Sequence, residues 1–133
     1  MLQVLPVGWK GKIYELGSGW GGLALRLSKK YPDAEVVAIE LSLVPFIVSF
    51  LRKALTGAKN LKIYRQDFYQ SSINDAGAIF CYLYPGAMKK LSPKFKEELK
   101  GVVISNSFAL PGWKESKILY APDLSATKIY VYS

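Results

Sequence analysis

The sequence predicts an α/β domain with an open, doubly wound and mostly parallel sheet that ends in an antiparallel C-terminal hairpin. Three observations predict this fold class. Apolar runs of strand length alternate with helical patterns over residues 12–108, which is typical of βαβ units. A glycine-rich turn directly follows the first run. Beyond residue 108 the chain contains strand-like runs but no helical pattern. At 133 residues, we expect a single domain over residues 1–133.

The first predicted strand spans residues 12–16 (KIYEL) and leads straight into the glycine-rich turn. A helix is predicted over 21–31, where leucines recur at four-residue spacing, and Pro32 ends it. Residues 35–40 (EVVAIE) read as the second strand, whose apolar run stops at Glu40.

The second helix is expected to begin after Ser42, which can cap it, and to stop near Gly57. Its first part belongs to the stretch LSLVPFIVSFL (41–51), which is apolar almost all round, so we expect the helix to be covered on more than one side. This stretch is shorter than the ~20 residues that span a bilayer. If its surplus apolar face is exposed, a homodimer or an association with a membrane surface is expected.

The remaining elements are predicted in order along the chain. They are a strand at 61–65, a central strand at 77–84 that is broken at Pro85-Gly86, a helix at about 87–100, and a strand at 101–108. The runs ESKILYA and TKIYVYS, separated by PDLSA (122–126), read as the closing hairpin.

Composition excludes several kinds of site. The chain has no histidine, which excludes Ser-His and Cys-His nucleophiles and histidine-ligated metals. Cys81 is the only cysteine and lies in an apolar run, so we expect a buried hydrophobic side chain, no disulfide and no metal site. No targeting peptide is visible, and a cytoplasmic location, or one at the periphery of a membrane, is expected.

The basic composition favours acidic partners. Lysine and arginine number 18 against 10 aspartate and glutamate residues, for a formal net charge of +8. Nucleic acid, anionic lipid and an acidic protein surface are all compatible with that charge. The sequence contains no specific nucleic-acid-binding motif.

The glycine-rich turn KIYELGSGWGG fits two signatures. Gly17, Gly19 and Gly22 form the GxGxxG pattern of a dinucleotide-binding turn, whereas Glu15, Gly17, Gly19 and Gly21 form an ExGxGxG pattern. A carboxylate two residues before the first glycine would repel a pyrophosphate, but it would attract the ammonium and sulfonium groups of S-adenosylmethionine. Glu15 therefore favours S-adenosylmethionine. The predicted binding residues in this turn are Glu15, Gly17, Ser18, Gly19 and Gly21.

Further candidates follow the second and third strands. Because ligands bind at the carboxyl ends of the strands in such sheets, Glu40 is placed to accept hydrogen bonds from ribose hydroxyls, with Leu41 beside it. NAD and S-adenosylmethionine share that requirement. Asp67 can accept from an adenine amine, and Phe68 offers a packing surface. The alternative for Asp67 is a turn residue.

These residues together resemble the class I S-adenosylmethionine-dependent methyltransferases. The segments ELGSGWG (15–21), VAIE (37–40), RQDF (65–68) and CYLYPGAM (81–88) occur in the order and at the spacing of that family. The resemblance implies a Rossmann-like fold of the class I methyltransferase type, with S-adenosyl-L-methionine as cofactor.

The whole chain also resembles the small methyltransferases related to the mitochondrial ATP-synthase c-subunit lysine methyltransferase. The similar segments are LYPGAMKKL (83–91), VVISNSFALPGW (102–113) and the ending TKIYVYS. This resemblance implies methyl transfer to a lysine of an acceptor protein, including hydrophobic or membrane-embedded ones. Members usually carry further residues ahead of the glycine loop. Here Met1 to Gly11 precede the first strand, so cover for the substrate is expected from other segments.

The candidate acceptor channel comprises Tyr82, Tyr84, Pro85, Phe108 and Trp113, whose rings could dry the channel and lower the pKa of an acceptor lysine. Each could instead be a core residue. The [DNS]PP[YFW] segment of nucleobase amino-methyltransferases is absent, which argues against adenine or cytosine as acceptor. Three alternatives remain open: methylation of RNA or a small molecule, a non-catalytic cofactor-binding module that needs a partner chain, and an NAD-dependent oxidoreductase.

Overall fold

A single seven-stranded sheet organises the fold. The computed structural model describes residues 4–121 and 127–133, so the PDLSA turn of the predicted hairpin lies outside the described residues. The sheet order is β3-β2-β1-β4-β5-β7-β6. The strands are β1 (Ile13–Leu16), β2 (Val36–Ile39), β3 (Leu61–Tyr64), β4 (Ala78–Cys81), β5 (Val102–Asn106), β6 (Lys117–Tyr120) and β7 (Lys128–Tyr132), and the helices are α1 (Gly22–Lys30), α2 (Leu43–Thr56) and α3 (Pro85–Glu98).

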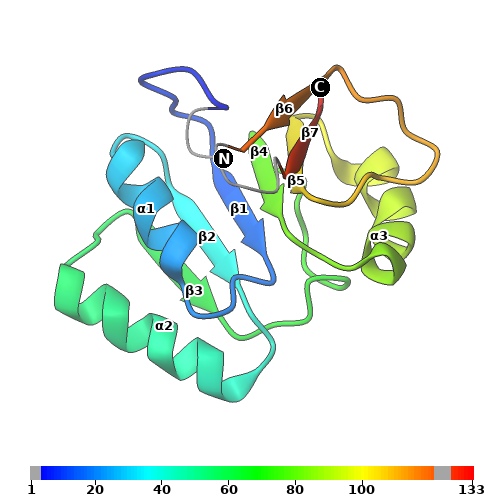
Figure 1. Cartoon of the computed structure of the whole chain (residues 1–133). Helices are drawn as coiled ribbons and strands as arrows, with labels where there is room; N and C mark the ends of the chain where they lie inside the picture. Colours follow the sequence, from blue (N-terminus) through cyan, green and yellow to red (C-terminus); the bar gives the residue numbers. More distant parts are fainter. Residues whose placement is uncertain (1–3, 122–126) are drawn as a thin grey trace.

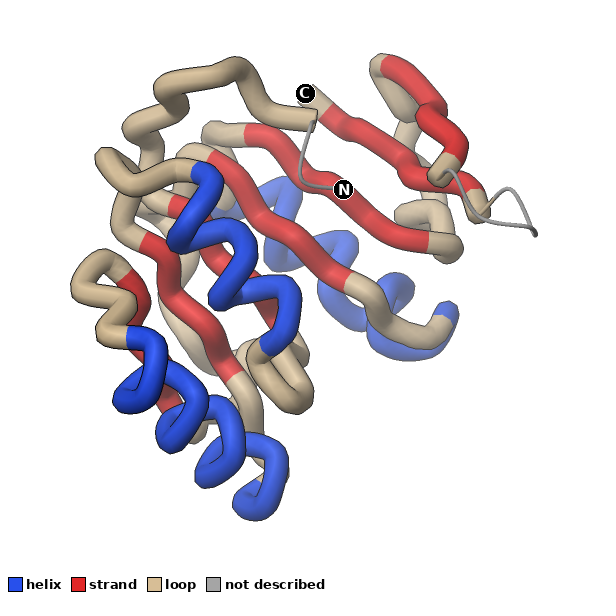
Figure 2. Tube along the Cα trace, turned by 60° about the vertical axis from the view of Figure 1, so that its left-hand side comes forward, coloured by secondary structure: helices blue, strands red, loops and turns tan. Residues whose placement is uncertain are grey.

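Helices cover both faces of this sheet. Figures 1 and 2 show α1 and α2 on one side and α3 on the other. Ala24 and Leu27 of α1 are buried in one core cluster, and Met88 and Leu91 of α3 in the other. β1 to β5 pair in parallel, whereas β7 pairs antiparallel with both β5 and β6. The predicted doubly wound fold with an antiparallel C-terminal pair is therefore confirmed.

The central strand is shorter than predicted. β4 ends at Cys81, so the prediction of a strand to residue 84 was wrong, and α3 begins at Pro85, slightly before the predicted start at about residue 87. Proline suits the first position of a helix because its fixed φ is already helical and no N–H is needed there. Cys81 is buried, and burial raises the pKa of its thiol to about 12, as expected for a hydrophobic side chain.

α2 is not covered on more than one side, so that prediction was also wrong. Ser49 is its only fully buried residue, and Leu43, Val44, Ile47, Phe50, Leu51 and Leu55 are exposed. The helix ends at Gly57 as predicted, with a left-handed φ of 67°. Ser42 occupies the N-cap position, but its side chain makes no capping hydrogen bond. None of the helices in the described part of the chain is long and apolar enough to cross a membrane.

Candidate functional site

The glycine-rich turn uses alternate glycines. Gly17, Gly19 and Gly21 have φ values of 71°, 56° and 86°, a left-handed region that disfavours other residues. Gly22 is the first residue of α1, and a Cβ atom there would meet only the Arg52 Nη1 atom, at 3.8 Å. The structure therefore requires the glycines of the ExGxGxG pattern and does not require Gly22, the third glycine of the dinucleotide pattern.

Neighbouring elements hold this loop on several sides. The Ile39 carbonyl at the end of β2 accepts the N–H groups of Gly17 and Ser18, at 2.9 and 3.1 Å. The Ser49 hydroxyl of α2 donates to the Gly19 carbonyl at 2.8 Å, and Arg52 donates from Nη1 to the Trp20 carbonyl at 2.9 Å. α2 thus fixes the outer side of the loop through two side chains.

Replacing Ser49 by alanine should loosen the loop without unfolding the protein. The Gly19 carbonyl would lose a buried donor, which costs about 1–3 kcal/mol. We expect the thermal midpoint to fall by several degrees and the affinity for S-adenosylmethionine to fall about tenfold, measured by calorimetry. Thr56→Ala is the matched control, since Thr56 also donates from α2 to backbone carbonyls but lies away from the loop. Equal affinities of the two variants would contradict this role of Ser49.

Glu15 and Ser18 place unpaired polar atoms beneath the loop. The two residues are only 7% and 8% exposed, and among the described residues the Glu15 Oε1 and Ser18 Oγ atoms have no hydrogen-bond partner. Burial raises the pKa of Glu15 to about 8, although the Ala24 backbone N–H and the charge of Arg26 act in the opposite direction. A buried carboxyl oxygen without a partner is costly unless a ligand supplies one.

A cavity of about 530 Å³ lies at the carboxyl ends of the strands, beside these two residues. The loop contributes Glu15, Gly17, Ser18, Gly19 and Trp20, the helices contribute Arg26 and Arg52, and the strand ends contribute Tyr82, Asn106 and Ile129. The Glu15 carboxyl group therefore lies in the wall of a cavity that is lined by residues from several strands of the sheet. The unpaired Glu15 oxygen can accept a hydrogen bond from the ammonium group of a ligand in this cavity.

The other predicted cofactor residues lie around the loop rather than in the cavity wall. The Glu40 carboxylate accepts the backbone N–H groups of Gly19 at 2.8 Å and Ser42 at 2.9 Å. Leu41 is 53% exposed beside it. The Asp67 Oδ1 atom accepts the Tyr69 N–H at 2.9 Å, so Asp67 acts as a turn residue in this structure. Phe68 lies against Gly17, where a Cβ atom would be 3.7 Å from its ring.

Of the candidate acceptor residues, Tyr82 alone lines the cavity. Its ring is 64% exposed and lies 6.3 Å from the Phe108 ring, centroid to centroid. Tyr84 and Pro85 are exposed beyond β4. Trp113 donates from Nε1 to Ser92 of α3 at 2.8 Å and packs edge-on against Tyr132, contacts that are typical of the alternative core role.

Sequence reasoning missed several residues of the site. Ser49, Arg52 and Asn106 hold or line the loop and cavity, yet no motif marks them. A serine in the middle of the apolar helix 43–56 was the available signal for Ser49, because a hydroxyl buried there needs an acceptor. Arg52 and Asn106 are distant from the glycine loop in the sequence and lie at the site only because the fold packs α2 and β5 beside it.

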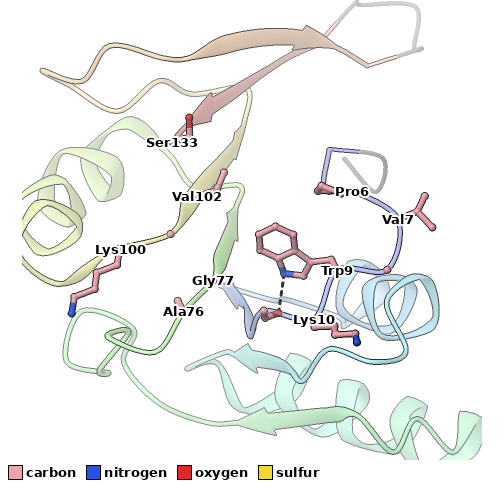
Figure 3. Close-up of a pocket in the computed structure, with 12 residues that line it drawn as sticks. Pro6, Val7, Trp9, Lys10, Ala76, Gly77, Lys100, Val102 and Ser133 are labelled. Atoms are coloured by element: carbon pink, nitrogen blue, oxygen red, sulfur yellow. Dashed lines mark hydrogen bonds between the residues drawn. The ribbon is translucent and has the colours of Figure 1, made fainter.

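A second cavity lies at the opposite edge of the sheet (Figure 3). It has a volume of about 770 Å³ and is lined by residues that precede β1, β4 and β5, with Ser133 beyond β7. The Trp9 side chain lines it and donates from Nε1 to the Gly11 carbonyl at 2.9 Å. This cavity is therefore separate from the carboxyl-edge site.

Comparisons with known proteins identify the family of this chain. The model of one protein family, described as the ANTKMT methyltransferase domain, matches residues 15–117. A protein-lysine N-methyltransferase of Saccharolobus islandicus is 24% identical over 99% of this chain and 84% of its own length.

Solved structures show the same fold. An RNA methyltransferase from Salinibacter ruber, in complex with S-adenosyl-L-homocysteine, superimposes with a TM-score of 0.83 at 25% identity, covering 92% of this chain and 79% of that one. A precorrin-6y C5,15-methyltransferase from Geobacter metallireducens superimposes with a TM-score of 0.71 at 13% identity, over 93% of this chain and 81% of that one. At that identity the second likeness concerns the fold alone.

Proposed function

Because the chain belongs to the ANTKMT methyltransferase domain family and is an S-adenosylmethionine-dependent methyltransferase, we propose that it methylates the side-chain amine of a protein lysine. The observation that supports lysine is the similarity to a protein-lysine N-methyltransferase along nearly the whole chain. The structure adds an aromatic pair that we assign to the acceptor: Tyr82 in the cavity wall, with the Phe108 ring 6.3 Å from it.

The residues of the carboxyl edge fit the cofactor. We assign Glu15 and Ser18 to its amino-acid part, because both have unpaired buried oxygens in the cavity wall. The left-handed glycines allow the backbone to approach the ligand closely. Glu40 and Asp67 are assigned to the ribose and the adenine, with Leu41 and Phe68 as packing surfaces. When bound, S-adenosylmethionine supplies a methyl group already activated on a positive sulfur, so the protein needs no general acid.

On the acceptor side, the protein must position a neutral amine and exclude water. A free lysine has a pKa near ~10.4 and is charged at neutral pH. The rings of Tyr82 and Phe108, once a bound acceptor covers them, would offer an apolar surface that disfavours the charged form. The same rings can hold the cation by cation–π contact before the proton leaves.

Glu40→Ala should weaken cofactor binding strongly. The carboxylate fixes the Gly19 N–H of the loop, and we assign it to the ribose hydroxyls, so its loss removes two kinds of charge-assisted hydrogen bond. We expect the Kd for S-adenosylmethionine to rise between tenfold and a hundredfold by calorimetry. Saturable binding that Glu40→Ala leaves unchanged would refute the site assignment.

Tyr82→Ala should lower methyl transfer and leave cofactor affinity nearly unchanged. Tyr82 is assigned to the acceptor, so truncation should lower the rate about tenfold or more through lost positioning. Tyr82→Phe keeps the ring and should retain most of the activity. A parallel loss of cofactor affinity in Tyr82→Ala would place this side chain on the cofactor instead.

The acceptor itself is identified by incubating the protein with methyl-labelled cofactor and host lysate. We expect label in protein and methyl-lysine by mass spectrometry of the modified polypeptide. Label that nuclease removes would favour RNA, an acceptor that the similarity to the Salinibacter ruber enzyme and the net charge of +8 also suggest. We further propose a cytoplasmic location, which the single buried cysteine supports.

A further inference from the structure

α2 exposes an apolar side to solvent, unlike an ordinary surface helix. A helix that packs on a sheet normally buries its apolar side and exposes its polar side. Here the fully buried residue is Ser49, whereas the solvent side is apolar. We call this side the outer face of α2; it comprises Leu43, Val44, Ile47, Phe50, Leu51 and Leu55, which are between 44% and 87% exposed. Contiguous apolar surface of this kind seldom stays uncovered.

Basic residues border the outer face. A groove of about 1030 Å³ between α1 and α2 is lined by Arg26, Lys29, Arg52 and Lys59, and Lys53 follows on the other flank of α2. Neither helix contains an acidic residue. None of these five cations forms an ion pair with the described parts of the chain. Lys29, Lys53 and Lys59 are therefore available to an outside partner, whereas Arg26 and Arg52 also line the cavity at the carboxyl edge.

The charges discriminate among the kinds of partner. A second copy joined through the same face would bring the two sets of cations together without any acid to pair them. Single-stranded nucleic acid stacks its bases on aromatic rings, but five of the six outer-face residues are aliphatic. An anionic bilayer complements both features, because it accepts apolar side chains below its headgroups and attracts cations at them.

We propose that the outer face of α2 and its bordering cations form a docking surface for an anionic lipid bilayer. Figures 1 and 2 show α2 at the margin of the molecule, beside the edge strand β3, where a flat surface can reach it. α2 also holds the glycine loop through Ser49 and Arg52, so docking brings the cofactor site close to the bilayer. This inference is independent of the identity of the methyl acceptor.

The test is flotation of the purified chain with vesicles of phosphatidylcholine or of equal parts phosphatidylcholine and phosphatidylglycerol. We expect the chain to float with the anionic vesicles, and to bind the neutral ones about tenfold more weakly or less. Added salt should weaken the binding, because screening shortens the reach of the headgroup charges. A chain that stays in the soluble fraction with both kinds of vesicle overturns the proposal.

Paired variants distinguish binding through the outer face of α2 from an attraction that depends only on the net charge of the chain. Leu51→Ser with Leu55→Ser should weaken vesicle binding about a hundredfold, whereas Val7→Ser, at a residue that is 93% exposed elsewhere, should not. Lys29→Glu with Lys59→Glu should weaken it far more than Lys114→Glu with Lys117→Glu, which changes the net charge equally.

Any one of three results would overturn the proposal. The first is unchanged vesicle binding in the double-leucine variant, and the second is an equal loss of vesicle binding in both charge variants. The third is a parent chain that is a dimer by light scattering and a double-leucine variant that is a monomer. Cofactor affinity by calorimetry should stay unchanged in all four variants. That measurement shows that the variants are folded, and it separates a failure of docking from a failure of the proposed methyltransferase site.

Discussion

Replacing Glu15 by glutamine should weaken S-adenosylmethionine binding about a hundredfold and make the ligand-free protein more stable at alkaline pH. The buried carboxyl group has an unpaired oxygen in the cavity wall, and we assign it to the ammonium group of the cofactor. A hydrogen bond between charged groups contributes about 1.5–3 kcal/mol. Glutamine keeps the shape and loses the charge. We expect the KM for the cofactor to rise with little change in kcat at saturation.

The pH dependence of stability gives an independent readout. The pKa of Glu15 is raised from 4.5 to about 8, so the folded chain keeps a proton that the unfolded chain loses between these pH values. The free energy of unfolding therefore falls as pH rises from about 4.5 to about 8 and stays low above it. A shift of this size corresponds to at most about 5 kcal/mol. The free energy of unfolding of the Glu15→Gln variant should not show this fall with pH.

Chemical denaturation at pH 5 and pH 9 measures this difference, in buffer without cofactor. The variant and the parent should be similar at the lower pH, with the variant clearly more stable at the higher. In the parent, cofactor binding at neutral pH should also release a proton, which calorimetry detects by repeating the titration in buffers of different ionisation enthalpy. Equal stability at both pH values, with unchanged cofactor affinity, would contradict both roles of Glu15.

Gly21→Ala should disrupt the site, whereas Gly22→Ala should not. Gly21 has a left-handed φ of 86°, and a Cβ atom there would lie 2.8 Å from the Ser49 Oγ atom and 3.3 Å from the Ser49 Cα atom. The substitution strains the backbone and displaces α2, at a cost of about 3 kcal/mol. At Gly22, alanine meets ordinary contacts and favours the helix by up to about 1 kcal/mol.

Denaturation curves and calorimetry with S-adenosylmethionine compare the two neighbours directly. Gly21→Ala should lower the midpoint and reduce cofactor affinity in the folded fraction by at least about tenfold. Gly22→Ala should keep both near the parent values or raise the midpoint. The reverse order of effects would mean that the loop follows the dinucleotide pattern after all.

Much of this fold is predictable because local patterns determine it. The apolar runs at 12–16, 35–40 and 61–65 became strands β1 to β3, and the periodicity after the glycine loop became α1. Glu15 is predicted to be a ligand residue because it is an acidic side chain two positions before the first glycine of the loop. These features depend on neighbours in the sequence.

The features that were missed depend on tertiary packing. Trp113 lies close to the predicted channel in the sequence, but its N–H group needs a buried acceptor and finds Ser92 of α3. The apolar residues of the outer face of α2 predict a buried helix, because the sequence pattern does not show which other segments are present to cover that face. Ser49 holds the loop by donating a hydrogen bond to the Gly19 carbonyl, which lies 30 positions earlier in the chain.

The unpaired acid beneath the loop also affects what happens after transfer. The ammonium group that we assign to Glu15 is the same in S-adenosylmethionine and in the spent S-adenosylhomocysteine, since only the sulfur loses its methyl group and its charge. Because the interaction between Glu15 and the ammonium group is the same before and after the reaction, it binds S-adenosylmethionine and S-adenosylhomocysteine equally. It therefore does not accelerate the chemical step. Product inhibition by S-adenosylhomocysteine should therefore be strong, and turnover in a cell should follow the ratio of the two molecules rather than the concentration of either one.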